Sequence, residues 1–243
     1  MASASAIPSG DRDPIASRSK FRTLAEVAIA YGLILLVIWT PRPWQHFLWI
    51  AAAAAVVVIT LISYEGRQAM GLRAGNFARS LWVVGVALLL AGAAVLVAAR
   101  FHTLHLPATP LAFVLTYFAY AVWSGVQQFL LQGVFLRRLL RIVPNTTRAA
   151  FLASALFAAA HLPSAVLTPM TLIWGFAACL IFLHYRNLYP LAIAHAILGI
   201  AVAITIPGPV DHNMRVGLSY ITYNHERHGP LPYPLKHPLP QPQ

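Results

Sequence analysis

Seven apolar segments separated by short polar stretches constrain what this chain can fold into. They cover residues 24–40, 44–63, 81–99, 111–136, 149–161, 165–184 and 188–206. A helix needs about 20 mostly apolar residues to cross the hydrocarbon core of a bilayer, and most of these segments approach that length. Only the segment 149–161 is short for a span. The sequence therefore predicts an all-α fold, a polytopic membrane helix bundle with about seven transmembrane helices.

Composition excludes the other broad classes of protein. Of the 243 residues, 59% are hydrophobic and 9% are charged, which is too apolar for a soluble domain or a disordered chain. The lone Cys179 cannot form a disulfide within the chain. A net charge of +11 would suggest nucleic acid as a partner in a soluble protein, but here the basic residues lie between apolar segments, as topology signals do. We expect no nucleic-acid partner.

The basic residues also predict an orientation. With the N-terminus in the cytoplasm, most arginines of the connecting segments fall on the inner side, and the outer loops keep only Arg42 and Arg100. We expect a protein integral to the cytoplasmic membrane of a prokaryote, with its N-terminus inside and its C-terminus outside.

The chain divides into three parts by composition. Residues 1–22 are polar and basic, residues 23–206 form the transmembrane domain, and residues 207–243 form a Pro-rich segment predicted to be an extended, flexible tail. The first apolar segment lacks a small-residue cleavage site, so we interpret it as a retained helix. Histidines in the tail have irregular spacing, which favours solvated side chains over metal ligands.

Acidic residues are nearly absent from the membrane region. The six are Asp11, Asp13, Glu26, Glu65, Asp211 and Glu226, and none lies between residues 66 and 210. Any mechanism that uses a buried carboxylate as general base, metal ligand or proton carrier must therefore find a substitute in this chain.

Three apolar segments instead carry clustered neutral polar residues. The first contains Gln127, Gln128 and Gln132, of which the last two share a helix face; the second contains Phe157 and His161, and the third His195. Taken singly, such amides and imidazoles are common contacts between membrane helices. Taken together, they predict one polar cavity shared by three helices.

The order and spacing of these residues resemble those of the CPBP family of intramembrane proteases, also called the Abi or type II CAAX prenyl endopeptidase family. The family motifs are Glu-Glu-x-x-x-Arg, Phe-x-x-x-His and His-x-x-x-Asn or Asp, and the resemblance covers roughly residues 116–203. The two histidine motifs agree in kind. Both glutamates are glutamine here, the arginine is Gln132, and the final Asn or Asp is Gly199.

The resemblance implies roles for these positions. In the family a glutamate and a histidine activate a water for attack on a peptide carbonyl, while the second histidine and the Asn stabilise the oxyanion. A glutamine amide has no comparable basic form, so the family mechanism cannot run unchanged. His161 or His195 could serve as the base, with the other as a donor to the oxyanion.

Three function classes follow. The first is an endopeptidase that acts on a hydrophobic or prenylated peptide. The second is a noncatalytic membrane protein that binds such a peptide or a lipid in the same cavity, or acts as a scaffold. A small transporter is the third, disfavoured because paired acidic residues and repeats are missing.

The remaining expectations concern partners and cofactors. Membrane lipids are expected partners. No cofactor is expected. A divalent metal is disfavoured, because His161 and His195, the only intramembrane candidates, would form a poor zinc shell with amide oxygens.

Overall fold

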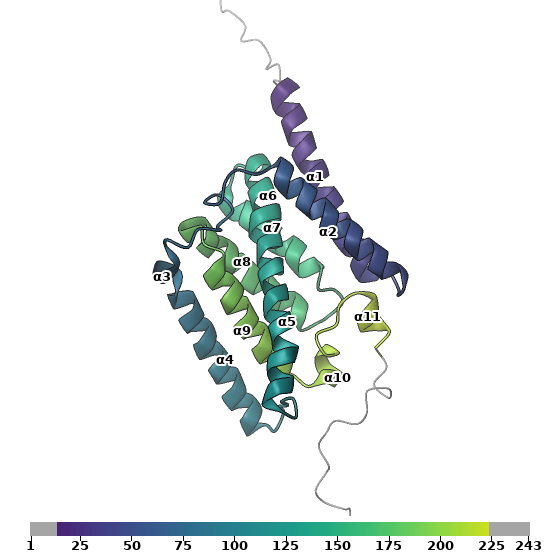
Figure 1. The fold of residues 1–243 in the computed structure, drawn as a ribbon, viewed down its shortest axis with the longest axis vertical. Helices are drawn as coiled ribbons and strands as arrows, with labels where there is room; N and C mark the ends of the chain where they lie inside the picture. Colours follow the sequence, from purple (N-terminus) through teal and green to yellow (C-terminus); the bar gives the residue numbers. More distant parts are fainter. Residues whose placement is uncertain (1–13, 224–243) are drawn as a thin grey trace, which may run out of the picture.

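The computed structural model describes residues 14–223, and within that range all the regular secondary structure is helical (Figure 1). The elements are α1 (Pro14–Trp39), α2 (Trp44–Ile62), α3 (Phe77–Ser80), α4 (Trp82–Arg100), α5 (Pro110–Gln128), the π-helix η1 (Phe129–Leu136), α6 (Arg137–Ile142), α7 (Thr146–Ala159), α8 (Leu167–Tyr185), α9 (Tyr189–Thr205), α10 (Gly208–Asp211) and α11 (Leu218–Ile221). The predicted all-α helical bundle is confirmed.

Helices occupy all seven of the predicted apolar segments. Among the described residues, four stretches are long and apolar enough to cross a membrane: 19–39, 44–62, 77–100 and 167–185. The apolar helices α7 and α9 are shorter, at 14 and 17 residues. The count of seven spans stays a prediction.

The long helices of the bundle pack against one another in three groups (Figure 1). Helix α1 packs against α2, α7 packs against α8, and α9 packs against both α4 and α5. The π-helix η1 contacts α2, α7 and α8, so it connects the α1–α2 pair to the rest of the bundle. It continues α5 into α6 without a break in helical backbone angles.

The ends of these helices follow local sequence signals. Thr109 and Asn145 cap α5 and α7, because each side chain accepts a hydrogen bond from a backbone N–H in the first turn, at 3.1 and 2.9 Å. Pro110 and Pro190 lie in the first turns of α5 and α9, where a missing N–H costs nothing.

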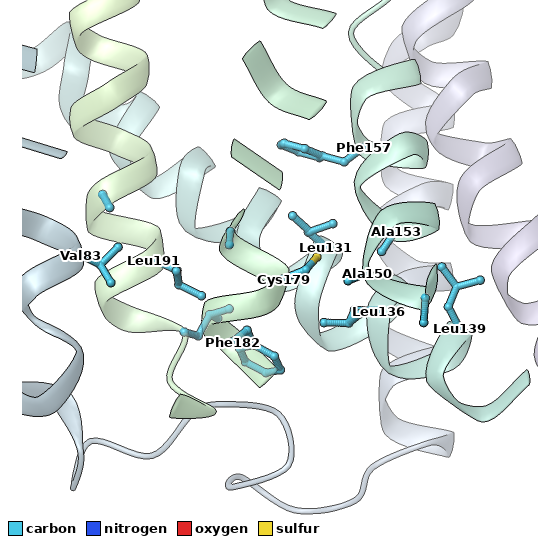
Figure 2. Packing of buried hydrophobic residues seen from close by; sticks show 14 of the residues in the cluster. Val83, Leu131, Leu136, Leu139, Ala150, Ala153, Phe157, Cys179, Phe182 and Leu191 are labelled. Atoms are coloured by element: carbon cyan, nitrogen blue, oxygen red, sulfur yellow. The ribbon is translucent and has the colours of Figure 1, made fainter. Parts of the chain in front are cut away.

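Small residues let α7 and α8 approach closely. Ala149, Ala150 and Ala153 are completely buried, and a methyl group added at Gly175 would lie 3.2 Å from Ser154 Cβ. Close backbone approach of this kind is how membrane helices gain packing contacts. Figure 2 shows Ala150 and Ala153 beside Leu131 and Cys179, with the ring of Phe157 at one end of the cluster.

A buried arginine ties α1 and α2 to η1 and α6. Arg138 is 3% exposed; its Nε donates to Glu26 at 3.0 Å, and its two terminal nitrogens donate to the carbonyls of Val134 and Ile59, each at 3.0 Å. The sequence-based expectation counts the arginines that follow residue 136 only as charges on the inner side of the membrane. The structure adds that Arg138 is a buried ion-pair partner inside the bundle.

A second carboxylate holds the loop between α2 and α3 in place. Glu65 forms ion pairs with Arg137 and Arg141 of α6. Burial raises the pKa of the Glu65 carboxyl, but the two guanidinium groups outweigh that effect and hold the pKa below its ordinary value. Arg137 is buried too, so it is likewise not a free loop charge.

Two terminal boundaries differ from the expectation. Helix α1 begins at Pro14 rather than near residue 24, and the first part of the expected flexible tail is folded. The backbone N–H of Gly217 donates to Leu162 O at 2.8 Å, and the ring of His212 stacks on Tyr220 at 3.9 Å. These contacts fix residues 207–223, while the prolines from Pro230 onward and the other tail histidines lie outside the described residues.

The buried pair yields a stability prediction. Glu26→Gln should lower the free energy of unfolding by about 3 to 5 kcal/mol, because it leaves the Arg138 charge buried without a partner. Thermal unfolding of the purified protein in detergent measures this. Arg22→Gln removes the other partner of the same carboxylate, a side chain that is 63% exposed, and should cost about 1 kcal/mol or less. Equal losses of unfolding free energy in the two variants would contradict the conclusion that the buried Glu26–Arg138 ion pair stabilises the bundle.

Candidate functional site

The glutamines and histidines predicted from the sequence meet where η1, α7 and α9 converge. Gln128 is the last residue of α5, and Gln132 lies one turn further, in η1. Phe157 lies in the last turn of α7, His161 follows that helix, and His195 lies in the middle of α9. π-helical turns are rare and frequently occur at functional sites. The π-helix η1 therefore supports this junction as a candidate functional site.

A chain of hydrogen bonds connects three of these side chains. Gln132 Nε2 donates to Gln128 Oε1 at 3.4 Å, and Gln128 Nε2 lies 3.1 Å from His195 Nδ1. Both glutamines are completely buried and His195 is 6% exposed. The Gln128 amide is thus used at both ends, by Gln132 on one side and by His195 on the other.

The second histidine joins the group through an aromatic ring. His161 Nδ1 lies 2.8 Å from the Phe157 carbonyl oxygen, one turn earlier. The Phe157 ring centroid is 4.9 Å from that of His161 and 5.8 Å from that of His195, both in edge-on geometry. The two imidazoles therefore pack against the same phenyl ring.

These hydrogen bonds assign opposite tautomers to the two histidines. A carbonyl oxygen only accepts, so His161 carries its proton on Nδ1 and keeps Nε2 as an acceptor. Since the Gln128 amide N–H₂ faces His195, Nδ1 of His195 accepts, and its Nε2 carries the proton. The site therefore offers one imidazole acceptor and one imidazole donor.

Sequence reasoning missed Trp174 on α8. Its ring lies 6.2 Å from that of His195, and its indole Nε1–H is buried without a hydrogen-bond partner among the described residues. An unpaired buried donor is costly, so a group of this kind beside a polar site is a candidate ligand contact. The only sequence signal was a tryptophan within an apolar helix, which is equally typical of packing.

Tyr120 was missed as well, and it affects the interpretation of Gly199. A Cβ atom at Gly199 would lie 1.8 Å from the Tyr120 hydroxyl oxygen. The hydroxyl thus fills the space that any side chain at position 199 would enter. The structure leaves no room for an Asn or Asp side chain at this position, because the phenol of Tyr120 on α5 takes up the space.

The other predicted positions are less involved. Gln127 is half-buried and lies outside the hydrogen-bonded chain in the part of the molecule that the structure describes. No three His, Cys, Asp or Glu side chains between residues 14 and 223 are grouped so that they could hold a metal. Two imidazoles fall short of the three protein ligands of a catalytic zinc site.

The contact at Gly199 gives a direct test. Gly199→Ala should lower the free energy of unfolding by about 1 to 3 kcal/mol, because the added methyl group overlaps the Tyr120 hydroxyl. Gly125→Ala on α5 is the matched control: its Cβ would meet Ala192 Cβ at 4.0 Å, an ordinary contact. That variant should be neutral or up to about 1 kcal/mol more stable. Thermal unfolding that ranks the two variants equally would exclude the predicted overlap.

Comparison with known proteins agrees with the motif resemblance. A family model described as type II CAAX prenyl endopeptidase Rce1-like matches residues 122–201, about a third of the chain. The match includes every motif position from Gln127 to Gly199. No curated protein and no solved structure matches the chain. The family match and the arrangement of the three motifs show that residues 122–201 are similar to the type II CAAX prenyl endopeptidase Rce1-like family, in a chain whose described part holds four helices long and apolar enough to cross a membrane.

Proposed function

We propose that this protein binds a hydrophobic peptide segment at the junction of η1, α7, α8 and α9 and does not hydrolyse it through a carboxylate-activated water. The observation that carries the proposal is the Gln132–Gln128–His195 hydrogen-bonded chain. Gln128 matches a position at which the family has glutamate. Its amide holds His195 in place and has no basic form with which to take a proton from water.

The described carboxylates support this proposal by their location. Glu26 and Glu65 are engaged by arginines at one end of the bundle, and Asp211 lies in α10, beyond the far end of α9. None of them belongs to the cluster around His195. A neutral cluster of this kind favours a neutral ligand, because a buried charge without a counter-charge is expensive.

The unused polar groups suit a peptide bond. His161 Nε2 can accept from a peptide N–H, while His195 Nε2–H and Trp174 Nε1–H can donate to a peptide carbonyl. The surrounding side chains are apolar, which favours a hydrophobic or prenylated segment. Arginines of the loop after α2, of α6 and of the α8–α9 turn gather at one end of the bundle, which supports an orientation with that end in the cytoplasm.

Hydrolysis with histidine as base is the second candidate. The opposite tautomers favour it: His161 Nε2 could take a proton from water as the water attacks a carbonyl, and His195 Nε2–H with Trp174 Nε1–H could stabilise the oxyanion. It would require no carboxylate. It therefore competes directly with the binding-only proposal and is separated from it by measuring cleavage.

Cleavage assays distinguish the two candidates. The wild-type protein, reconstituted in vesicles with farnesylated and unmodified reporter peptides, should show cleavage that is undetectable or about 10²- to 10⁴-fold below that of a glutamate-containing family member. His161→Ala should leave this background unchanged. Robust cleavage that is lost in both His161→Ala and His195→Ala would show instead that the protein is a histidine-dependent hydrolase.

Binding should depend on the indole of α8. Trp174→Phe should weaken binding of a dye-labelled hydrophobic peptide roughly 2- to 10-fold, since it removes one hydrogen-bond donor while keeping an aromatic ring. Fluorescence anisotropy in detergent measures the dissociation constant. Trp49→Phe makes the same substitution on α2, where the side chain is 53% exposed, and should leave the constant unchanged. Identical constants in both variants would argue against Trp174 as a ligand contact.

A further inference from the structure

A basic cavity lies at the arginine-rich end of the bundle, outside the site described above. It has a volume of about 380 Å³ and is bordered by the loop before α4 and by the turn between α8 and α9. Arg73, Arg79 and Arg186 line it, together with His184 and Tyr185. Three guanidinium groups around one cavity of this size create a strongly positive local potential.

The described carboxylates leave these arginines without counter-charges. Glu26 pairs with Arg22 and Arg138, and Glu65 pairs with Arg137 and Arg141. Asp211 follows the C-terminal end of α9, roughly 25 Å along that helix from the turn that holds Arg186. Within residues 14–223, no carboxylate therefore remains to neutralise the cavity.

Hydrogen bonds fix the walls of the cavity before any ligand arrives. Asn76 Nδ2 donates to the carbonyl of Tyr185, and Asn187 Nδ2 donates to Asn76 Oδ1 at 2.9 Å. Asn187 is 1% exposed, and its own Oδ1 accepts from Tyr189 N at 3.0 Å. A preformed site loses less conformational freedom on binding than a loose cluster of surface arginines would.

An apolar hollow adjoins the basic cavity on the surface of α4. It measures about 420 Å³ and is lined by Leu81, Trp82, Val84, Gly85 and Leu88. From Leu81 to Leu88 it extends roughly 10 Å along the helix axis, away from the arginines. The two hollows share a wall, because Trp82 Nε1 donates to Tyr185 Oη at 3.2 Å.

We propose that these two hollows together bind one anionic phospholipid. The phosphate-containing headgroup occupies the cavity of Arg73, Arg79 and Arg186, and one acyl chain lies in the hollow of α4. Guanidinium groups are suited to phosphate oxygens through paired N–H donors. A basic site at the membrane surface that continues into an apolar hollow matches an anionic lipid better than free phosphate, which would leave the apolar part unused.

Native mass spectrometry of the full-length protein, titrated with phosphatidylglycerol and with phosphatidylcholine of the same acyl chains, tests the proposal. One phosphatidylglycerol should be retained preferentially. The double substitution Arg73→Gln, Arg79→Gln should weaken its binding roughly 20- to 30-fold, since each basic residue near an anionic lipid contributes a factor of about five. The matched control Arg67→Gln, Arg148→Gln removes the same charge from residues that do not line the cavity, and should change binding by less than about twofold.

The acyl-chain part of the proposal has its own variant. A side chain added at Gly85 meets no atom within 4 Å of its Cβ, so Gly85→Leu should fill the hollow without disturbing the fold and should weaken phosphatidylglycerol binding. Gly92→Leu is the control, because this glycine is on the same helix with equally open space and does not line the hollow.

Three outcomes would overturn the proposal. One is equal retention of the two lipids, and another is equal binding by the cavity variant and its charge-matched control. The third is competition by inorganic phosphate together with unchanged binding in Gly85→Leu, which would assign the cavity to a soluble anion instead of a lipid.

Discussion

Polar groups inside a bilayer must find their hydrogen-bond partners within the protein, and this constraint shapes the interior of the bundle. The continuous helix formed by α5, η1 and α6 meets this constraint at two places. Gln132 donates to Gln128, which in turn holds His195 of α9, while Arg138 donates to Glu26 of α1 and to a backbone carbonyl of α2. The same helix therefore fixes the positions of α9 on one side and of α1 and α2 on the other. Its polar contacts give these positions a specificity that apolar packing alone would not provide.

Hydropathy predicted the helical fold well because the bilayer imposes a minimum apolar length. It could not predict the role of Arg138. An arginine next to an apolar segment has the same pattern whether it faces the cytoplasm or turns inward to a carboxylate more than a hundred residues earlier in the chain. The start of α1 was missed for a related reason, since a helix can continue past the apolar stretch into polar residues.

The candidate site was predictable only in part. Spacing singled out Gln128, His161 and His195 because polar residues in apolar helices are few, and the structure brings them to one junction. Trp174 and Tyr120 carry no such signal. Each is recognisable only from its surroundings: a buried donor without a partner in one case, and a hydroxyl in the space beside a facing glycine in the other.

The π-helix between α5 and α6 has a consequence for the directions in which that long helix faces. A π-turn inserts an extra residue into the α-helical repeat, and one residue rotates everything beyond it by about 100° around the axis. The residues before η1 can thus face α9 while those after it face α1 and α2, and the backbone angles at both junctions stay helical. The π-helix thus changes the direction in which later side chains point. One continuous helix can therefore present the amide of Gln128 to α9 and the guanidinium of Arg138 to α1 and α2.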